Sequence, residues 1–171
     1  MGYSSKQRAK RKKLIQVREI GPEDMKYIWA AYRKDGLEEF DPVLGVDMGL
    51  EDFKQAFVEC VNGKYNAIWI ITGPVSGREP MPIAFVTGWV RGRILEMGHA
   101  TWFPWVAPRV IFDAAEVFFE RARREYFVME FARERDQRFF DAVAKTGVIK
   151  RTARFHGMYP GEAAILYIAK V

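Results

Sequence analysis

The spacing of apolar side chains alternates along this chain between the two-residue period of strands and the three-to-four-residue period of helices. Short apolar runs predict strands over 14–20, 67–72, 83–89, 94–103, 126–131, 148–155 and 163–170. Apolar positions three and four residues apart predict helices over about 22–34, 50–61, 109–125 and 133–145. The predicted order of elements is therefore β-α-α-β-β-β-α-β-α-β-β.

Glycine and proline mark the ends of several of these elements. Pro22, followed by two acidic residues, is typical of a helix start, and Gly147 is typical of a helix end. Gly92 lies between two apolar runs and predicts a hairpin. The segment 157–161 is predicted to be the loop that joins the last two strands.

This order predicts a single α/β domain of the mixed α+β kind over residues 14–171, preceded by a basic flexible arm over 1–13. Strands that alternate with helices in the second half indicate a crossover onto a parallel pair, and the hairpins indicate antiparallel strands. The expected fold is a central mixed sheet with helices on both faces. A hydrophobic content of 49% is ample for its core.

Composition excludes several classes of protein. No apolar run approaches the ~18 residues of a membrane span, and the basic N-terminus lacks the apolar stretch of a secretory signal. The single cysteine, Cys60, cannot form an intrachain disulfide, which favours a reducing, cytoplasmic location. Two histidines are too few for a typical zinc site, so no metal is expected.

The net charge of +5 comes mainly from one short segment. The 27 lysines and arginines include six within residues 6–13, and the rest of the chain nearly balances its 22 acidic residues. Two interpretations stay open, a disordered solvated terminus and an electrostatic contact with nucleic acid or an acidic protein surface. The candidate contact residues are Lys6, Arg8, Lys10, Arg11, Lys12 and Lys13.

The junction between the strand 94–103 and the helix that follows it is the first candidate for a ligand site. A turn-forming run over 103–108 leads into Arg109-Val110-Ile111-Phe112-Asp113-Ala114. Backbone N–H groups at such a junction converge on one point, where a phosphate can bind.

The order of elements and this junction resemble the GNAT superfamily of acyl-CoA N-acyltransferases. In that family the junction reads Gln/Arg-x-x-Gly-x-Gly/Ala and holds the CoA pyrophosphate. Arg109 and Ala114 match the pattern, whereas Phe112 replaces the central glycine and either fills the phosphate site or turns into the core. The resemblance implies acetyl-CoA or CoA as ligand, held by Arg109, Val110, Ile111, Phe112 and Ala114.

The resemblance also implies a general base for the amine acceptor and a tyrosine that protonates the departing thiolate. Glu96 is the candidate base, although a solvent-facing role is the alternative, and His99, three residues on, lies on the opposite face of a regular strand. Val143 stands where the family has its tyrosine, so the acid would be Tyr159, the candidate residue, or a water. The acidic loop over 36–49 is a candidate acceptor wall, and the aromatics at 102, 103 and 105 line a pocket or belong to the core.

The last part of the chain also resembles GNAT-like proteins of bacteriophage structural gene clusters, of the podovirus internal virion protein A type. The matching segments are Arg138-Phe139-Phe140, Lys145-Thr146-Gly147 and Lys150-Arg151. This implies a virion-associated or interaction protein with little or no classical acetyl transfer, partnered by virion proteins, in the virion or the host cytoplasm. The alternatives are an active acetyl-CoA-dependent N-acetyltransferase for an amine and a protein that binds nucleic acid through its basic arm.

Overall fold

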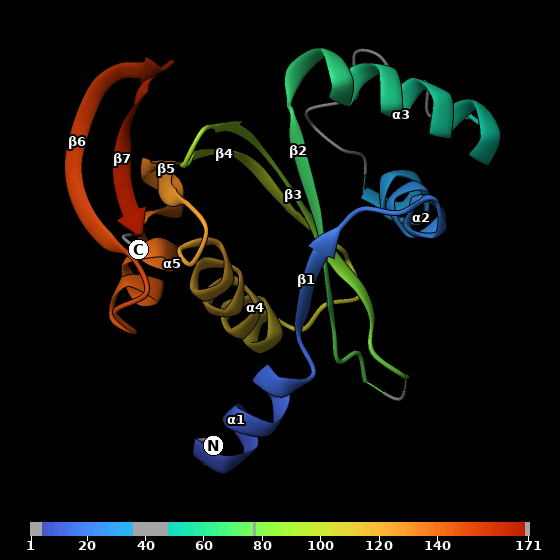
Figure 1. Cartoon of the computed structure of the whole chain (residues 1–171), viewed down its shortest axis with the longest axis horizontal. Coiled ribbons are helices and arrows are strands. Elements are labelled where there is room, and N and C mark those ends of the chain that lie inside the picture. The colour runs from blue at the N-terminus through green and yellow to red at the C-terminus, as the bar shows by residue number, and fades with distance from the viewer. Residues whose placement is uncertain (1–4, 36–47, 77, 170–171) are drawn as a thin grey trace.

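The computed structural model describes residues 5–35, 48–76 and 78–169. Within them, seven strands form one sheet in the order β1-β2-β3-β4-β5-β7-β6 (Figure 1). The strands are β1 (Gln16–Glu19), β2 (Ala67–Gly73), β3 (Met81–Arg91), β4 (Ile94–Trp102), β5 (Phe127–Arg133), β6 (Lys150–Tyr159) and β7 (Glu162–Ala169). Neighbouring strands are antiparallel except β4 and β5, which are parallel.

Helices cover both faces of the sheet, as the sequence predicts. They are α1 (Ser5–Lys13), α2 (Met25–Asp35), α3 (Leu50–Lys64), α4 (Pro108–Ala122) and α5 (Gln137–Ala144), with short 3-10 helices η1 (Pro22–Asp24) and η2 (Glu134–Asp136). Helices α2 and α3 lie on one side of the sheet, and α4 and α5 lie on the other (Figure 1). The predicted mixed α/β fold is confirmed.

The core consists of two clusters of buried side chains, one on each face of the sheet. The cluster beneath α4 and α5 contains Phe118, Phe119 and Val143, and the cluster beneath α2 and α3 contains Ile28, Phe53 and Phe57. Because β2 and β3 are buried on both faces, they read as nearly continuous apolar runs. Burial of this apolar surface on both sides stabilises the sheet.

The parallel pair β4–β5 is short, and its two strands then separate. Their ladder covers Ile94↔Phe127, Leu95↔Val128 and Glu96↔Met129. Helix α4 connects the two strands and packs over the point of separation (Figure 1). This divergence creates the space for the candidate site.

The N-terminal segment differs from the flexible arm that its composition indicates. Residues 5–13 form helix α1, which lies beside α4 (Figure 1). The physical reason is charge pairing across more than 100 residues, because Arg8, Arg11 and Lys12 all meet carboxylates of α4.

The last hairpin also differs from prediction. The predicted loop over 157–161 is largely strand, because β6 continues to Tyr159 and pairs it with Glu162 across a two-residue turn. Gly157 has a φ of +80° and lies within the irregular register between Phe155 and Tyr159, so it bends the strand instead of ending it. Gly147, with a φ of +82°, ends the α5 region as predicted.

None of the helices in the described segments is long and apolar enough to cross a membrane.

Candidate active site

A cleft of about 450 Å³ opens where β4 and β5 separate. Its walls come from the second half of β4, the first turns of α4, the end of β5, the start of α5, and Tyr159 of β6. Beyond Glu96 and Met129 the two strands no longer pair with each other. The backbone N–H and C=O groups that β4 and β5 direct toward each other beyond this point can therefore hydrogen-bond to the amide groups of a ligand.

A bulge in β4 shapes one wall of this cleft. Gly88 is opposite Met97 and Thr87 is opposite His99, so Gly98 is an extra residue. Met97 and Ala100 both pack against the core beneath α4 although they are three residues apart. The bulge therefore shifts the alternation of side chains between the two faces by one residue.

Gly98 is required at the bulge by a close approach of another side chain. A Cβ at this position would overlap the ring of Tyr65. That ring is also 4.8 Å, between centroids, from the ring of Trp89. Aromatic packing on the α2–α3 face thus holds the bulge in place.

Glu130 is the cleft carboxylate that sequence reasoning missed. It lies on β5, is half-buried, and is opposite Tyr167 of β7. Desolvation raises its pKa to about 8, and the nearby charge of Asp136 adds to the effect. A carboxylate that titrates near neutral pH is suited to accept a proton from an amine. The feature of the sequence that could have identified Glu130 is that it is the one carboxylate within the apolar run 126–131.

Tyr159, the predicted acid, lines the same cleft. Its hydroxyl donates a 2.7 Å hydrogen bond to the backbone carbonyl of Phe131. Desolvation raises the pKa of Tyr159, and the charge of Glu130 raises it further. The structure thus brings a phenol and a carboxylate together from strands that are almost 30 residues apart.

Glu96, the predicted base, is not among the residues that line this cleft. It is opposite Trp89 in the β3–β4 ladder, and cross-strand partners share a face. Trp89 contacts Tyr65 on the α2–α3 side, so Glu96 faces that side. His99 does line the cleft.

The predicted phosphate-binding residues lie in a regular helix. Helix α4 begins at Pro108, so the N–H groups of Phe112 and Ala114 bond within the helix. Val110 and Ala114 are buried in the core, Ile111 lines the cleft, and Arg109 is exposed in the first turn. Phe112 is half-buried against the core beneath the guanidinium of Arg8, whose carbon is 5.2 Å from the ring centroid.

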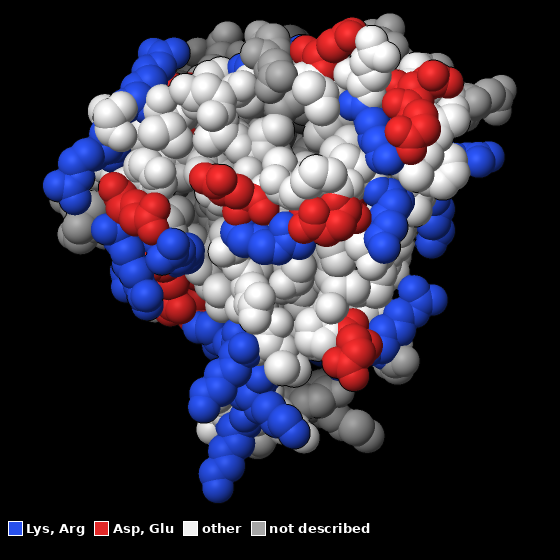
Figure 2. All heavy atoms as spheres, turned by 45° about the vertical axis from the view of Figure 1, so that its right-hand side comes forward, with Lys and Arg blue, Asp and Glu red and all other residues white. Residues whose placement is uncertain are grey.

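The six basic residues of α1 divide into two faces. Arg8, Arg11 and Lys12 are paired with Asp113 and Glu116 of α4, whose side chains are 2% and 10% exposed. Figure 2 shows the lysine and arginine side chains of α1 protruding as one group at the foot of the molecule. The exposed lysines of α1 are Lys6, Lys10 and Lys13.

The remaining expectations divide between the cleft, the core and residues outside the structure. Trp102 lines the cleft, Phe103 is buried in the core, and Trp105 donates its indole N–H to the carbonyl of Pro82. The acidic residues of the predicted acceptor wall, at 38, 39, 41 and 47, lie outside the described residues. Across the described ranges, no group of three or more His, Cys, Asp or Glu side chains is arranged to hold a metal.

Comparison with solved structures identifies the fold. The chain is similar to spermidine N-acetyltransferase from Vibrio cholerae, a structure in complex with CoA and spermine, at TM-score 0.61 and 6% identity over 92% of this chain and 96% of that one. It is similar to a probable GNAT-family acetyltransferase from Chromobacterium violaceum, at TM-score 0.63 and 10% identity over 92% and 83%. It is also similar to the ribosomal-protein-S18-alanine N-acetyltransferase from Escherichia coli, at TM-score 0.56 and 10% identity over 91% and 92%.

No protein-family model and no curated protein matches the sequence. The finer resemblance to phage virion proteins gains no support from the structural neighbours. At these identities the likeness is one of fold, and the chain has the fold of GNAT-family N-acetyltransferases.

Proposed function

We propose that this protein is an N-acyltransferase that binds an acyl-CoA thioester in the β4–β5 cleft and transfers the acyl group to an amine. The observation that carries the proposal is the position of Glu130 and Tyr159 in one cleft at the divergence of two parallel strands. An acid and a base are the two proton-handling groups that aminolysis of a thioester needs. This reverses the preference for a non-catalytic role that the sequence alone favours.

The cleft suits the amide-bearing arm of CoA. Beyond Glu96 and Met129, the facing edges of β4 and β5 are unpaired with each other, so an extended ligand with amide groups would take the place of a missing strand. Phe139, Phe140 and Trp102 supply apolar surface beside it. A volume of about 450 Å³ is in the usual range for a small-molecule site.

The phosphate end of the ligand would lie at the N-terminal turn of α4. Ile111, in that turn, lines the cleft, and the dipole of a helix favours anions at its N-terminus. Arg109 is exposed in the same turn, and Arg133 and Arg135 line the cleft. Guanidinium groups would then replace the glycine-rich backbone contact that Phe112 removes.

The chemistry assigns one proton to each of two side chains. The amine attacks the thioester carbonyl, so a C–N bond forms and the C–S bond breaks. Ionised Glu130 accepts the proton that the amine nitrogen loses, and Tyr159 gives its phenolic proton to the departing thiolate. Proton transfer from Glu130 back to Tyr159, directly or through water, restores the starting state.

Titration calorimetry with acetyl-CoA tests the first step. We expect micromolar binding by the wild type, at least tenfold weaker binding by Arg109→Ala, and unchanged binding by Arg124→Ala, an exposed residue in the turn that follows α4. No heat of binding at millimolar acetyl-CoA would overturn the proposal and leave a non-catalytic interaction role.

Release of free thiol in the presence of candidate amines tests the second step. The first acceptors to try are spermine and a peptide with an N-terminal alanine, because neighbouring structures are named for a polyamine and for an alanine acceptor. Glu130→Gln and Glu96→Gln form a matched pair, one carboxylate in the cleft and one on the α2–α3 face. We expect the larger loss of kcat, about 100-fold, from Glu130→Gln.

A further inference from the structure

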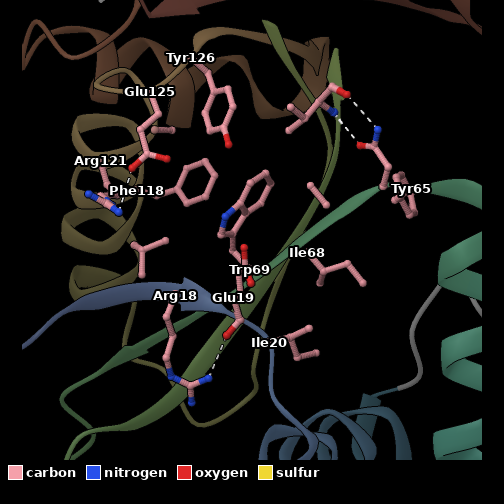
Figure 3. A pocket seen from close by; sticks show the side chains of 15 residues that line it. Arg18, Glu19, Ile20, Tyr65, Ile68, Trp69, Phe118, Arg121, Glu125 and Tyr126 are labelled. Carbon is pink, nitrogen blue, oxygen red and sulfur yellow. Dashed lines mark hydrogen bonds and ion pairs between the residues drawn. The ribbon is translucent and has the colours of Figure 1, made fainter. Parts of the chain in front are cut away.

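A second and larger cavity, of about 670 Å³, lies at the other end of the sheet from the acyl-transfer cleft. It is bounded by the end of β1, the start of β2, the end of β3 and the last turns of α4 (Figure 3). The acyl-transfer cleft borders the second half of β4. This cavity instead borders Val90 of β3, which is opposite Leu95 near the start of β4. Phe118 is the one lining residue that the two cavities share within the described residues.

Three aromatic rings form the inner wall of this cavity. Trp69 of β2 and Phe118 of α4 meet edge to face, with ring centroids 6.0 Å apart. Tyr126, just after α4, points into the same space with its hydroxyl (Figure 3). Ile20 and Ile68 add aliphatic surface on the opposite side (Figure 3). A flat apolar body would find ring faces to pack against here.

Both cations that line the cavity are paired with carboxylates other than that of Glu19. Arg18 is held by Asp24 through two hydrogen bonds of 2.7 Å, which raise the pKa of the guanidinium, and Arg121 pairs with Glu125 at 2.9 Å. Glu19 is directly opposite Trp69 in the β1–β2 ladder, so the two side chains share a face. Glu19 is exposed at the mouth of the cavity, and in the described part of the chain its carboxylate has no ion-pair or hydrogen-bond partner.

Two polar groups of the aromatic wall are also unpartnered. Neither the indole N–H of Trp69 nor the hydroxyl of Tyr126 makes a hydrogen bond to another described residue. Both side chains are partly buried, and polar tips of partly buried aromatics usually find a partner. The cavity therefore combines an unneutralised carboxylate, aromatic faces and two unused polar groups.

We propose that this cavity is a second ligand site, for an organic ammonium ion carried on an aromatic body. The ammonium group would lie between Glu19 and the electron-rich faces of Trp69 and Tyr126, because both an anion and aromatic faces attract a desolvated cation. The aromatic body would pack against Trp69 and Phe118. A ligand bound here would be separated from the acyl-transfer cleft by Phe118, which lines both cavities.

Calorimetric titration with 2-phenylethylamine tests this site, with 2-phenylethanol and 3-phenylpropionate as neutral and anionic probes of similar size. We expect submillimolar binding of the amine, at least tenfold weaker binding of the alcohol, and no binding of the acid. Glu19→Gln should weaken amine binding about tenfold and leave the alcohol unchanged, since it removes charge without volume. Equal affinity for amine and acid, or an unchanged affinity in Glu19→Gln, would overturn the proposal.

A second variant separates this site from the transferase cleft. Because 2-phenylethylamine carries a primary amine, the group that the proposed transferase would acylate, Glu130→Gln serves as the matched control in the other cleft. We expect Glu130→Gln to keep wild-type amine affinity and Glu19→Gln to lose it. Loss of affinity in Glu130→Gln alone would assign the ligand to the transferase cleft and overturn the second site. Acetyl-CoA binding by Glu19→Gln reports on the proposed acyltransferase independently of this result.

Discussion

Arg11 of α1 and Asp113 of α4 are 102 positions apart in the sequence, yet the Nε of Arg11 is 2.5 Å from Oδ2 of Asp113. Arg8 meets the other carboxylate oxygen of Asp113 at 3.0 Å. Asp113 is thus a nearly inaccessible anion whose charge is balanced by two cations from the other end of the chain. On the neighbouring faces of the same helix, Ile111 and Ala115 line the β4–β5 cleft.

Removing both cations should destabilise the protein strongly. Arg8→Ala combined with Arg11→Ala leaves Asp113 buried without a counter-charge, which typically costs about 3–5 kcal/mol in the free energy of unfolding. Urea unfolding measures this loss. The matched control is Lys6→Ala with Lys10→Ala on the exposed face of α1, where we expect a change within about 0.5 kcal/mol. Equal losses in the two double variants would contradict the pairing.

Stability should fall as pH rises through the range set by Glu130. Burial raises the pKa of Glu130 from 4.5 to about 8, so between these values the folded protein keeps a proton that the unfolded chain has released. The free energy of unfolding contributed by this group is therefore full below about pH 4.5 and is lost progressively toward pH 8 and above. Glu130→Gln lacks this dependence.

Thermal unfolding of wild type and Glu130→Gln from pH 5 to pH 9 checks this expectation. The variant should gain stability relative to the wild type as pH rises, and parallel curves across the range would contradict a raised pKa. The same ionisation should appear in catalysis as a kcat that increases with pH through about 8, because the base acts in its ionised form.

Tyr159→Phe should separate a catalytic phenol from a structural one. It removes the 2.7 Å hydrogen bond to the carbonyl of Phe131, at a cost of about 1 kcal/mol in stability, and lowers kcat about 100-fold. Tyr167→Phe is the matched control, since Tyr167 is also a buried phenol and bonds Asp141 at 2.7 Å, but it does not line the cleft. Its kcat should remain near that of the wild type, and similar kcat losses in both variants would argue against Tyr159 as the acid.

Alanine at Gly98, within the β4 bulge, and alanine at Gly88, on the facing strand β3, should differ in whether a second substitution rescues them. A Cβ at Gly88 would be 2.8 Å from the backbone oxygen of Glu96, whereas a Cβ at Gly98 would meet the movable ring of Tyr65. We expect a loss of about 1–3 kcal/mol from each substitution, measured by urea unfolding. Tyr65→Leu should restore stability to Gly98→Ala but not to Gly88→Ala, because a strand backbone cannot move aside as a side chain can.

The candidate site was only partly accessible from the sequence. Tyr159 and Arg109 could be named from the chain, but the pairing of Tyr159 with Glu130 depends on the β5–β7–β6 arrangement. Glu96 and His99 illustrate the limit most directly. Regular alternation along β4 would place their side chains on opposite faces of the sheet. The bulge between the two residues changes this alternation, and the bulge is recognised only from the register with β3.

The sequence by itself determined the identity and order of nearly all strands and helices over residues 14–171. Apolar periodicity, Pro22, Gly92 and Gly147 are local signals that act within a few residues. Tertiary structure alone decided that residues 5–13 are helical, that Gly98 is a bulge, and that Glu130 faces a cleft. Each of these depends on groups far along the chain, namely Asp113 for the helix, Tyr65 for the bulge and Tyr159 for the carboxylate. Such contacts become fixed only when burial and charge pairing bring distant segments together.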